Sequence, residues 1–108
     1  MDNCITSLGL MSGTSLDGID ASIINSDGNS HLKVKVNHFY EYKAEFRQKL
    51  RDYIKNINSI EDIENSIIEY KNIEKEITLL HSDISKKLIS RNNTDVDLVC
   101  FHGQTIIH

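Results

Sequence analysis

The most constraining feature of the sequence is a stripe of apolar residues that recurs every three or four positions from Ile60 to Leu88. That period is typical of an amphipathic helix, and it predicts a single helix of about 30 residues. Ser59 and Asp62 resemble a capping box at its start, and a shorter apolar stripe predicts another helix over 43–57. Because no clean heptad with paired charges accompanies the long stripe, packing of this helix onto a sheet is favoured over a coiled coil.

Apolar runs that precede the helical region predict strands. Residues 4–11 are apolar enough for a buried strand, whereas 18–25 and 31–42 alternate between apolar and polar side chains. The Asp27-Gly28 pair between the two alternating runs is a strong hairpin signal. We therefore predict three consecutive strands in an antiparallel meander, with the lysine-bearing strand 31–42 at an edge of the sheet.

A fourth strand is predicted over 96–101, after the helices. Because a long helical connection precedes it, this strand is expected to lie parallel to an earlier one. The segment HGQT (102–105) is expected to break the run, and 106–107 is expected to begin a further strand. The order indicates an α/β fold, in which a three-stranded antiparallel meander is followed by two helices and a parallel strand.

Length and composition restrict the class of protein. A chain of 108 residues forms one domain at most, and its formal net charge of −4 argues against a general nucleic-acid binder. No apolar run approaches the ~20 residues that span a bilayer, and the N-terminus lacks the features of a signal peptide. We therefore expect a cytoplasmic protein without a membrane or nucleic-acid partner. Cys4 and Cys100 each lie in an apolar run and are expected to be small buried core residues.

Small, hydroxylated and acidic residues, SGTSLDG (12–18), join the first two predicted strands. Gly13 and Gly18 are spaced as in the phosphate loop GxxxxGK[ST], but Ile19 and Asp20 stand where that loop requires lysine and a hydroxyl residue. A strand is also predicted to follow, in place of the helix whose N-terminus would meet a phosphate. The chain is therefore not a Walker-type nucleotidase.

A different phosphate cradle is compatible with this segment. Its two glycines would permit positive φ angles and a close approach of backbone N–H groups to a phosphate. Further hydrogen-bond donors are the hydroxyls of Ser12, Thr14 and Ser15. Asp17 and Asp20 would repel bare phosphate, but they suit a site in which Mg²⁺ lies between carboxylate and phosphate, with water interposed. The alternative is a long hairpin loop with Asp17-Gly18 as its turn, and the residues alone leave both interpretations open.

Two motifs resemble those of a known family. GLMSGTSLDGIDASI (9–23) resembles the opening signature of the anhydro-N-acetylmuramic acid kinases, and CFHGQTIIH (100–108) resembles a second motif of that family. The first motif is long and specific, whereas the helical middle of the chain matches only in arrangement. The family belongs to the sugar-kinase, Hsp70 and actin superfamily, whose lobes are built on a ribonuclease-H-like β-β-β-α-β-α-β core. The resemblance implies that residues 1–108 are the incomplete N-terminal part of the first actin-like ATPase lobe.

The resemblance also implies roles for residues of both motifs. The stretch from 13 to 20, joined by the serine before it, would be the ATP phosphate loop. The phosphate-binding set is then Ser12, Gly13, Thr14, Ser15, Leu16, Asp17, Gly18, Ile19 and Asp20. Asp20 is in addition the candidate for holding Mg²⁺ through water. His102 and Gln104 would hydrogen-bond the sugar or shape its pocket, the alternative being a satisfied, partly buried His102 next to a simple turn at Gly103.

The reaction implied by the family uses ATP to phosphorylate the primary oxygen of anhydro-N-acetylmuramic acid while water opens the anhydro bridge, in the recycling of cell-wall sugar. The family's general-base aspartate lies beyond the second motif, so no catalytic residue is assigned to this chain and the second lobe is absent. We therefore expect an N-terminal kinase fragment that is inactive alone, from an enzyme that is a homodimer when complete. The alternatives are one half of a split kinase, whose second lobe is a separate polypeptide, and a non-catalytic phosphate- or sugar-binding module.

Overall fold

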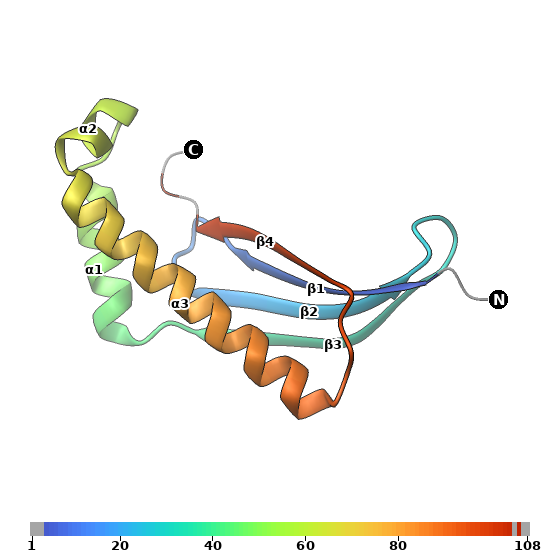
Figure 1. Ribbon diagram of the computed structural model, residues 1–108. Coiled ribbons are helices and arrows are strands. Elements are labelled where there is room, and N and C mark those ends of the chain that lie inside the picture. The colour runs from blue at the N-terminus through green and yellow to red at the C-terminus, as the bar shows by residue number, and fades with distance from the viewer. Residues whose placement is uncertain (1–3, 105, 107–108) are drawn as a thin grey trace.

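A computed structural model describes residues 4–104 and 106, which form a sheet and three helices. In chain order the elements are β1 (Ile5–Ser12), β2 (Gly18–Ser26), β3 (Leu32–Glu41), α1 (Ala44–Lys55), α2 (Ile60–Asn65), α3 (Ile67–Asn92) and β4 (Leu98–Gln104). The molecule is elongated, with extents of 53 × 26 × 21 Å, because α1 and α2 gather at one end of the sheet while α3 crosses its face (Figure 1). Each helix of the described part is too short or too polar to cross a membrane.

The strands form one sheet in the order β3-β2-β1-β4. β2 is antiparallel to both of its neighbours, whereas β4 runs parallel to β1. This topology confirms the predicted meander, the parallel fourth strand and the edge position of β3. Lys33 and Lys35 of β3 are exposed, as expected for an edge that must resist pairing with other chains.

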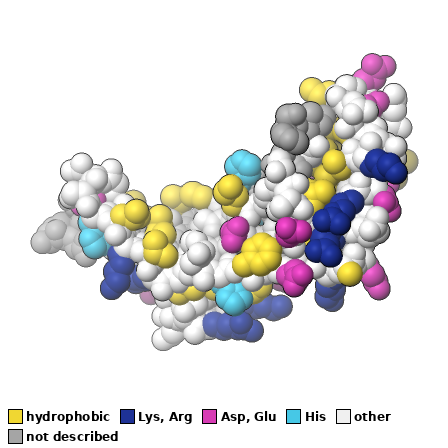
Figure 2. All heavy atoms as spheres, turned by 180° about the vertical axis from the view of Figure 1, so that it is seen from behind, with side chains coloured by type: hydrophobic (Ala, Val, Ile, Leu, Met, Phe, Trp, Pro, Cys, Tyr) yellow, Lys and Arg dark blue, Asp and Glu magenta, His cyan; other side chains and the backbone are white. Residues whose placement is uncertain are grey.

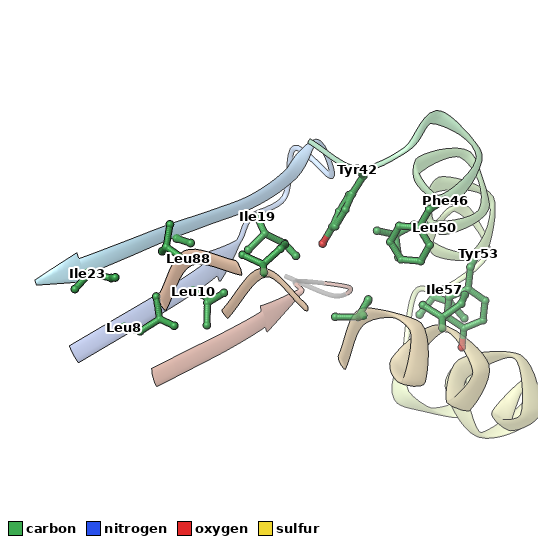
Figure 3. Close-up of a cluster of buried hydrophobic side chains, with 14 residues drawn as sticks. Leu8, Leu10, Ile19, Ile23, Tyr42, Phe46, Leu50, Tyr53, Ile57 and Leu88 are labelled. Carbon is green, nitrogen blue, oxygen red and sulfur yellow. The ribbon is translucent and has the colours of Figure 1, made fainter. Parts of the chain in front are cut away.

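One face of the sheet is covered by helices and holds the hydrophobic core. Side chains along a strand alternate between its two faces, and alternate residues of β1 and β2, such as Leu8 and Ile23, are buried on the covered face. Figure 3 shows the same cluster reaching Leu88 of α3 and continuing to Phe46 and Leu50 of α1. The long helical stripe therefore packs onto the sheet, as predicted, and not into a coiled coil.

The prediction of one long helix is wrong at Ser66, where α2 and α3 meet. Ser66 has φ −126° and ψ 36°, which lie outside the helical range. Its hydroxyl donates to the Asp62 carbonyl oxygen at 2.8 Å and lies 3.0 Å from the Tyr53 hydroxyl. Thr78 and Ser85 make the same kind of hydroxyl-to-carbonyl bond within α3 without breaking it, so the contact with Tyr53 of α1 is what distinguishes Ser66, where the helix breaks although the apolar period continues. The capping box of Ser59 and Asp62 is confirmed at the start of α2.

The prediction that the HGQT segment breaks the fourth strand is also wrong, because β4 continues to Gln104. A β-bulge makes this possible. Between two paired positions β1 advances from Leu10 to Ser12, while β4 advances from Phe101 to Gln104 and so contains one extra residue. Gly103 lies in the bulge with φ +85°, a left-handed conformation that glycine adopts without strain.

The bounds of β4 differ from the prediction at its start as well. The strand begins at Leu98, whereas the apolar pattern had indicated a start at Val96. The further strand expected at 106–107 is not seen at Ile106, and Ile107 lies outside the described residues.

The second face of the sheet is open to solvent. Cys100 is exposed there, which corrects the expectation that both cysteines are buried, and Cys4 is partly buried. Other exposed apolar side chains of the sheet include Ile5, Met11, Phe39 and Leu98. Figure 2, which views the molecule from the side opposite to α3, shows hydrophobic side chains in the open. Continuous apolar runs such as those of β1 and β4 are typical of strands that are covered on both faces of the sheet. In this structure, however, the described residues cover only one face of the sheet.

His81 of α3 is a buried titratable group that makes stability depend on pH. Its side chain is 3% exposed, its Nδ1 lies 2.8 Å from the Ile77 carbonyl oxygen, and no described group bonds its Nε2. Burial lowers the pKa of His81 below its ordinary value of 6.5, which the bond to Ile77 partly offsets. Because the unfolded chain binds this proton more readily than the folded chain, stability is lost as the pH falls through 6.5 towards the folded-state pKa.

Urea unfolding of the chain is therefore expected to have a lower midpoint near pH 5 than near pH 7, and His81→Phe is expected to reduce that difference. The substitution keeps an aromatic ring against Phe101, whose ring centroid is 4.5 Å from that of His81, and it removes the titration. A difference between the two pH values that is the same in His81→Phe would assign the pH dependence to other groups.

Candidate functional site

The loop between β1 and β2, residues 13–17, follows Ser12 at the end of β1. Thr14 and Ser15 are exposed, and no group in the described part of the chain accepts their backbone N–H. Ser12, in contrast, is 1% exposed. Two hydroxyls and two amides of the loop therefore face solvent, while the hydroxyl of Ser12 belongs to the interior.

The tight turn of this loop is made at Leu16 and not at its glycines. Leu16 has φ +59°, whereas Gly13 and Gly18 have no positive φ, contrary to the expectation from the sequence. The Leu16 amide donates to the Gly13 carbonyl oxygen at 3.4 Å, and the Leu16 side chain packs against the hydrophobic core. This packing offsets the strain of a left-handed leucine.

The two glycines of the motif differ in their surroundings. A Cβ atom on Gly18 would lie against the Tyr40 carbonyl oxygen and 2.8 Å from Cζ of Phe39, so the pairing of β2 with β3 requires glycine at this position. A Cβ atom on Gly13 would meet no atom within 4 Å. The fold therefore does not require glycine at position 13, and the space beside it is open to a ligand.

The two aspartates of the motif also differ. Asp17 Oδ1 lies 3.7 Å from Nη1 of Arg47 and 3.9 Å from Nη2 of Arg51, both on α1. These pairs are largely exposed and contribute little to stability, but they place two positive charges beside the loop. Asp20 lies in β2 on the open face of the sheet, where its carboxylate is exposed.

Tyr42, which follows β3, joins the loop to the end of β4. Its hydroxyl lies 3.1 Å from Ser12 Oγ and 2.9 Å from Gln104 Oε1, and Gln104 Nε2 donates to the Gly13 carbonyl oxygen at 2.7 Å. The Tyr42 side chain is 5% exposed, and Figure 3 shows it reaching inward beside Phe46. Burial raises the pKa of Tyr42, an effect that the bond with Ser12 opposes. The hydroxyl is therefore protonated at neutral pH and is able to donate.

The two candidate sugar-binding residues lie on the two sides of Gly103. Gln104 reaches the loop, whereas His102 is exposed. Both line a cavity of about 350 Å³ between α3 and β4. The residues of α3 that line it are Tyr70, Ile73, Glu74, Ile77 and Thr78. A mixed apolar and polar lining of this kind is common in small-molecule pockets.

The structure thus brings Ser12, Gly13 and Gln104 into one hydrogen-bonded group, although Gly13 and Gln104 are 91 residues apart. His102 and Asp20 do not belong to that group. No sequence pattern indicated a role for Tyr42, because a tyrosine at the end of an alternating strand pattern resembles any half-buried residue. Its role becomes visible once the ends of β1, β3 and β4 are placed together.

Comparison with known proteins identifies the family that has these motifs. The family model for anhydro-N-acetylmuramic acid kinase matches residues 5–108. The chain belongs to the anhydro-N-acetylmuramic acid kinase family. Over its whole length it is 46% identical to the anhydro-N-acetylmuramic acid kinase of Pelagibacter ubique (strain HTCC1062) and 36% identical to that of Rhizobium etli. Over 95% of its length it is 31% identical to the Agrobacterium fabrum kinase of the same name.

These matches cover 29%, 30% and 28% of the three kinases, respectively, so the chain spans less than a third of the length of the curated relatives it matches. It corresponds to the N-terminal part of anhydro-N-acetylmuramic acid kinases, which confirms the predicted family and the prediction of an N-terminal fragment. Both motifs on which the resemblance rests, 9–23 and 100–108, lie within the family match. In the fold they meet at the hydrogen bond between Gln104 and Gly13.

Proposed function

We propose that the chain provides the ATP phosphate-binding part of a kinase that phosphorylates anhydro-N-acetylmuramic acid. The observation that carries this proposal is the open loop after β1, where the amides of Thr14 and Ser15 have no acceptor among the described residues and no atom fills the space beside Gly13. Backbone N–H groups and hydroxyls together are common phosphate ligands. The substrate follows from the family, whose members are named for this activity.

In this proposal the residues of the loop have different roles. Thr14 and Ser15 donate to phosphate oxygens from their amides and hydroxyls, and Gly13 leaves room for the phosphate to approach. Leu16 makes the turn, and Gly18 allows β2 to pair closely with β3. Two further members of the motif, Ser12 and Ile19, are buried and support the loop from the core.

Asp20 is the residue that we expect to hold Mg²⁺ through water. Its exposed carboxylate, together with water and phosphate oxygens, is the kind of donor set that Mg²⁺ prefers. Asp17 faces Arg47 and Arg51 and is better suited to fixing the loop against α1. When bound, Mg²⁺ would neutralise charge on the phosphates during transfer.

The sugar side of the site is represented in this chain by the end of β4. His102 is exposed and is among the residues that line the cavity between α3 and β4, and an imidazole can hydrogen-bond a hydroxyl or carboxylate of a substrate. We further propose that the sheet and helices are the beginning of a ribonuclease-H-like, actin-like ATPase lobe, since the order β-β-β-α-β with a parallel fourth strand agrees with that core. We propose a cytoplasmic location from the sequence features described above, and a homodimeric complete enzyme from the resemblance to the family.

The test is a chimera in which residues 1–108 replace the corresponding N-terminal part of the Pelagibacter kinase. With ATP and Mg²⁺ we expect the chimera to phosphorylate anhydro-N-acetylmuramic acid with a kcat/KM within about tenfold of that of the parent enzyme. The 108-residue chain alone should give no turnover above background, because the general base and the second lobe are expected outside it. Turnover by the chain alone, or a chimera that melts like its parent but is inactive, would contradict the proposal.

A further inference from the structure

We propose that Tyr42 and Gln104 are positioning residues, which hold the loop after β1 in its phosphate-binding conformation by fixing the peptide between Gly13 and Thr14. The inference deepens the proposed function, and its kinetic consequence rests on that function. Under it Gln104 acts on ATP through the loop, in place of the direct contact with the sugar that its motif had indicated.

The first step is the geometry of the Gly13–Thr14 peptide. The Gly13 carbonyl oxygen accepts a hydrogen bond from Gln104 Nε2 at 2.7 Å. In a trans peptide, the C=O of one residue and the N–H of the next point in opposite directions, and no described peptide bond is cis. With its carbonyl held by Gln104, this peptide directs the Thr14 N–H away from Gln104. Because no described group accepts that N–H, it is held as a donor for an incoming anion.

The second step is how Gln104 comes to face the loop. Side chains alternate along a strand, so without the bulge Gln104 would lie on the face of the sheet opposite to Phe101. The extra residue in β4 instead pairs Gln104 with Ser12, whose side chain is on the buried face. Gly103 makes the bulge with its φ of +85°. The bulge at Gly103 thus places the Gln104 side chain on the face of the sheet from which it bonds to Gly13.

The third step is the orientation of the Gln104 amide, which Gly13 and Tyr42 fix from its two ends. The Tyr42 hydroxyl has two acceptors within reach, Gln104 Oε1 at 2.9 Å and Ser12 Oγ at 3.1 Å, and its single proton can be donated to the glutamine. If the amide were turned over, its oxygen would face the Gly13 carbonyl oxygen and the two would repel each other. The Gly13 carbonyl therefore selects the orientation in which the amide nitrogen faces it, and the Tyr42 hydroxyl holds the amide oxygen in that orientation.

Tyr42 is itself held on two sides. Its ring makes an edge contact with Phe46 of α1, with 5.0 Å between centroids and 78° between planes. Its backbone N–H donates to the Asp17 carbonyl oxygen at 2.9 Å. Tyr42 and Gln104 together tie both ends of the loop, at Gly13 and at Asp17, to the rigid part of the fold.

A first experiment measures loop order in the 108-residue chain by amide hydrogen exchange. Tyr42→Phe removes the hydroxyl alone, and its matched control is Tyr53→Phe, since Tyr53 is 3% exposed and its hydroxyl lies 3.0 Å from the hydroxyl of Ser66, outside the loop. We expect Tyr42→Phe to speed exchange at the Leu16 amide, which bonds to the Gly13 carbonyl, by about tenfold. The control should change it by less than about twofold. Equal exchange at Leu16 in the two variants would overturn the inference.

A second experiment measures kinetics in the chimera with the Pelagibacter kinase. Tyr42→Phe and Gln104→Met are each expected to raise KM for ATP about tenfold and to leave KM for the sugar within about twofold. Because both variants disrupt one hydrogen-bonded unit, the double variant should be no worse than either single one. Tyr53→Phe should leave both constants unchanged at temperatures well below melting.

The outcomes separate this inference from the proposed function. If Gln104→Met raises KM for the sugar while Tyr42→Phe changes neither constant, Gln104 contacts the sugar and the inference is wrong. Increases in KM for ATP that add in the double variant would also overturn it. A folded but inactive chimera would remove the proposed function, and the exchange rates in the isolated chain would still decide whether Tyr42 orders the loop.

Discussion

Gly13→Val is expected to abolish ATP-dependent turnover of the chimera while leaving the fold of the segment intact. A valine side chain would fill the space beside position 13, which no protein atom within 4 Å occupies and which the proposed function assigns to a phosphate. Loss of phosphate positioning of this kind is expected to lower kcat/KM by about 10³-fold or more. Stability should not fall, because Gly13 has no positive φ and its backbone is compatible with an L-residue.

The measurement combines steady-state kinetics of the chimera with thermal unfolding of the 108-residue chain. Gly13→Ala should lie between glycine and valine in activity, since a methyl group fills less of the same space. Binding of the sugar, followed by calorimetry, is the internal control and should be preserved in both variants. Activity near that of the parent in Gly13→Val would place the phosphates elsewhere and remove the loop from the active site.

Gly18→Ala is expected to have the opposite effect, a loss of stability of about 2–3 kcal/mol. The added methyl group would meet the backbone of β3, at the Tyr40 carbonyl oxygen and 2.9 Å from the Cα atom of Glu41. Backbone in a paired strand moves little, so the first residues of β2 would have to separate from β3. The start of β2 directly follows the loop, and we therefore expect the loop to lose its shape as well.

Urea unfolding of the chain checks this prediction against Gly9→Ala as the matched control. Gly9 lies within β1, and a Cβ atom there would meet no atom within 4 Å, so its substitution should change the unfolding free energy by less than about 0.5 kcal/mol. Equal stability of Gly18→Ala and Gly9→Ala would show that β3 yields to the added methyl group. If both glycine predictions hold, the two glycines of the motif are required for different reasons, Gly13 for access of a ligand and Gly18 for the pairing of β2 with β3.

Much of the fold could be predicted from the sequence because apolar periodicity is a local signal. The alternation in β2 and β3, the helical stripe of α1 and α3, and the capping box at Ser59 each follow from neighbouring residues. The parallel direction of β4 follows from the length of the helical connection before it. The motifs at 9–23 and 100–108 were sufficient to predict the family, which the family model confirms.

The errors of sequence reasoning arise where a local signal meets a tertiary constraint. The apolar stripe runs through Ser66 without interruption, but the helix breaks at this serine, whose hydroxyl contacts Tyr53 of α1. Gly103 is expected from the sequence to break the strand, but β4 continues through it because the pairing with β1 accommodates Gly103 in a β-bulge. Cys100 lies in an apolar run that predicts burial on both faces, and its own face of the sheet is open.

The sequence by itself determined the elements, their order, the family and the loop as the candidate phosphate site. The tertiary structure decided that Gly18 is a packing glycine, that Leu16 makes the turn, and that Tyr42 and Gln104 reach Ser12 and Gly13. The physical reason is that periodicity depends on residues close in the chain, whereas these contacts depend on the register of β4 against β1. One extra residue at the bulge changes the face on which the Gln104 side chain lies, and no local pattern reports that change.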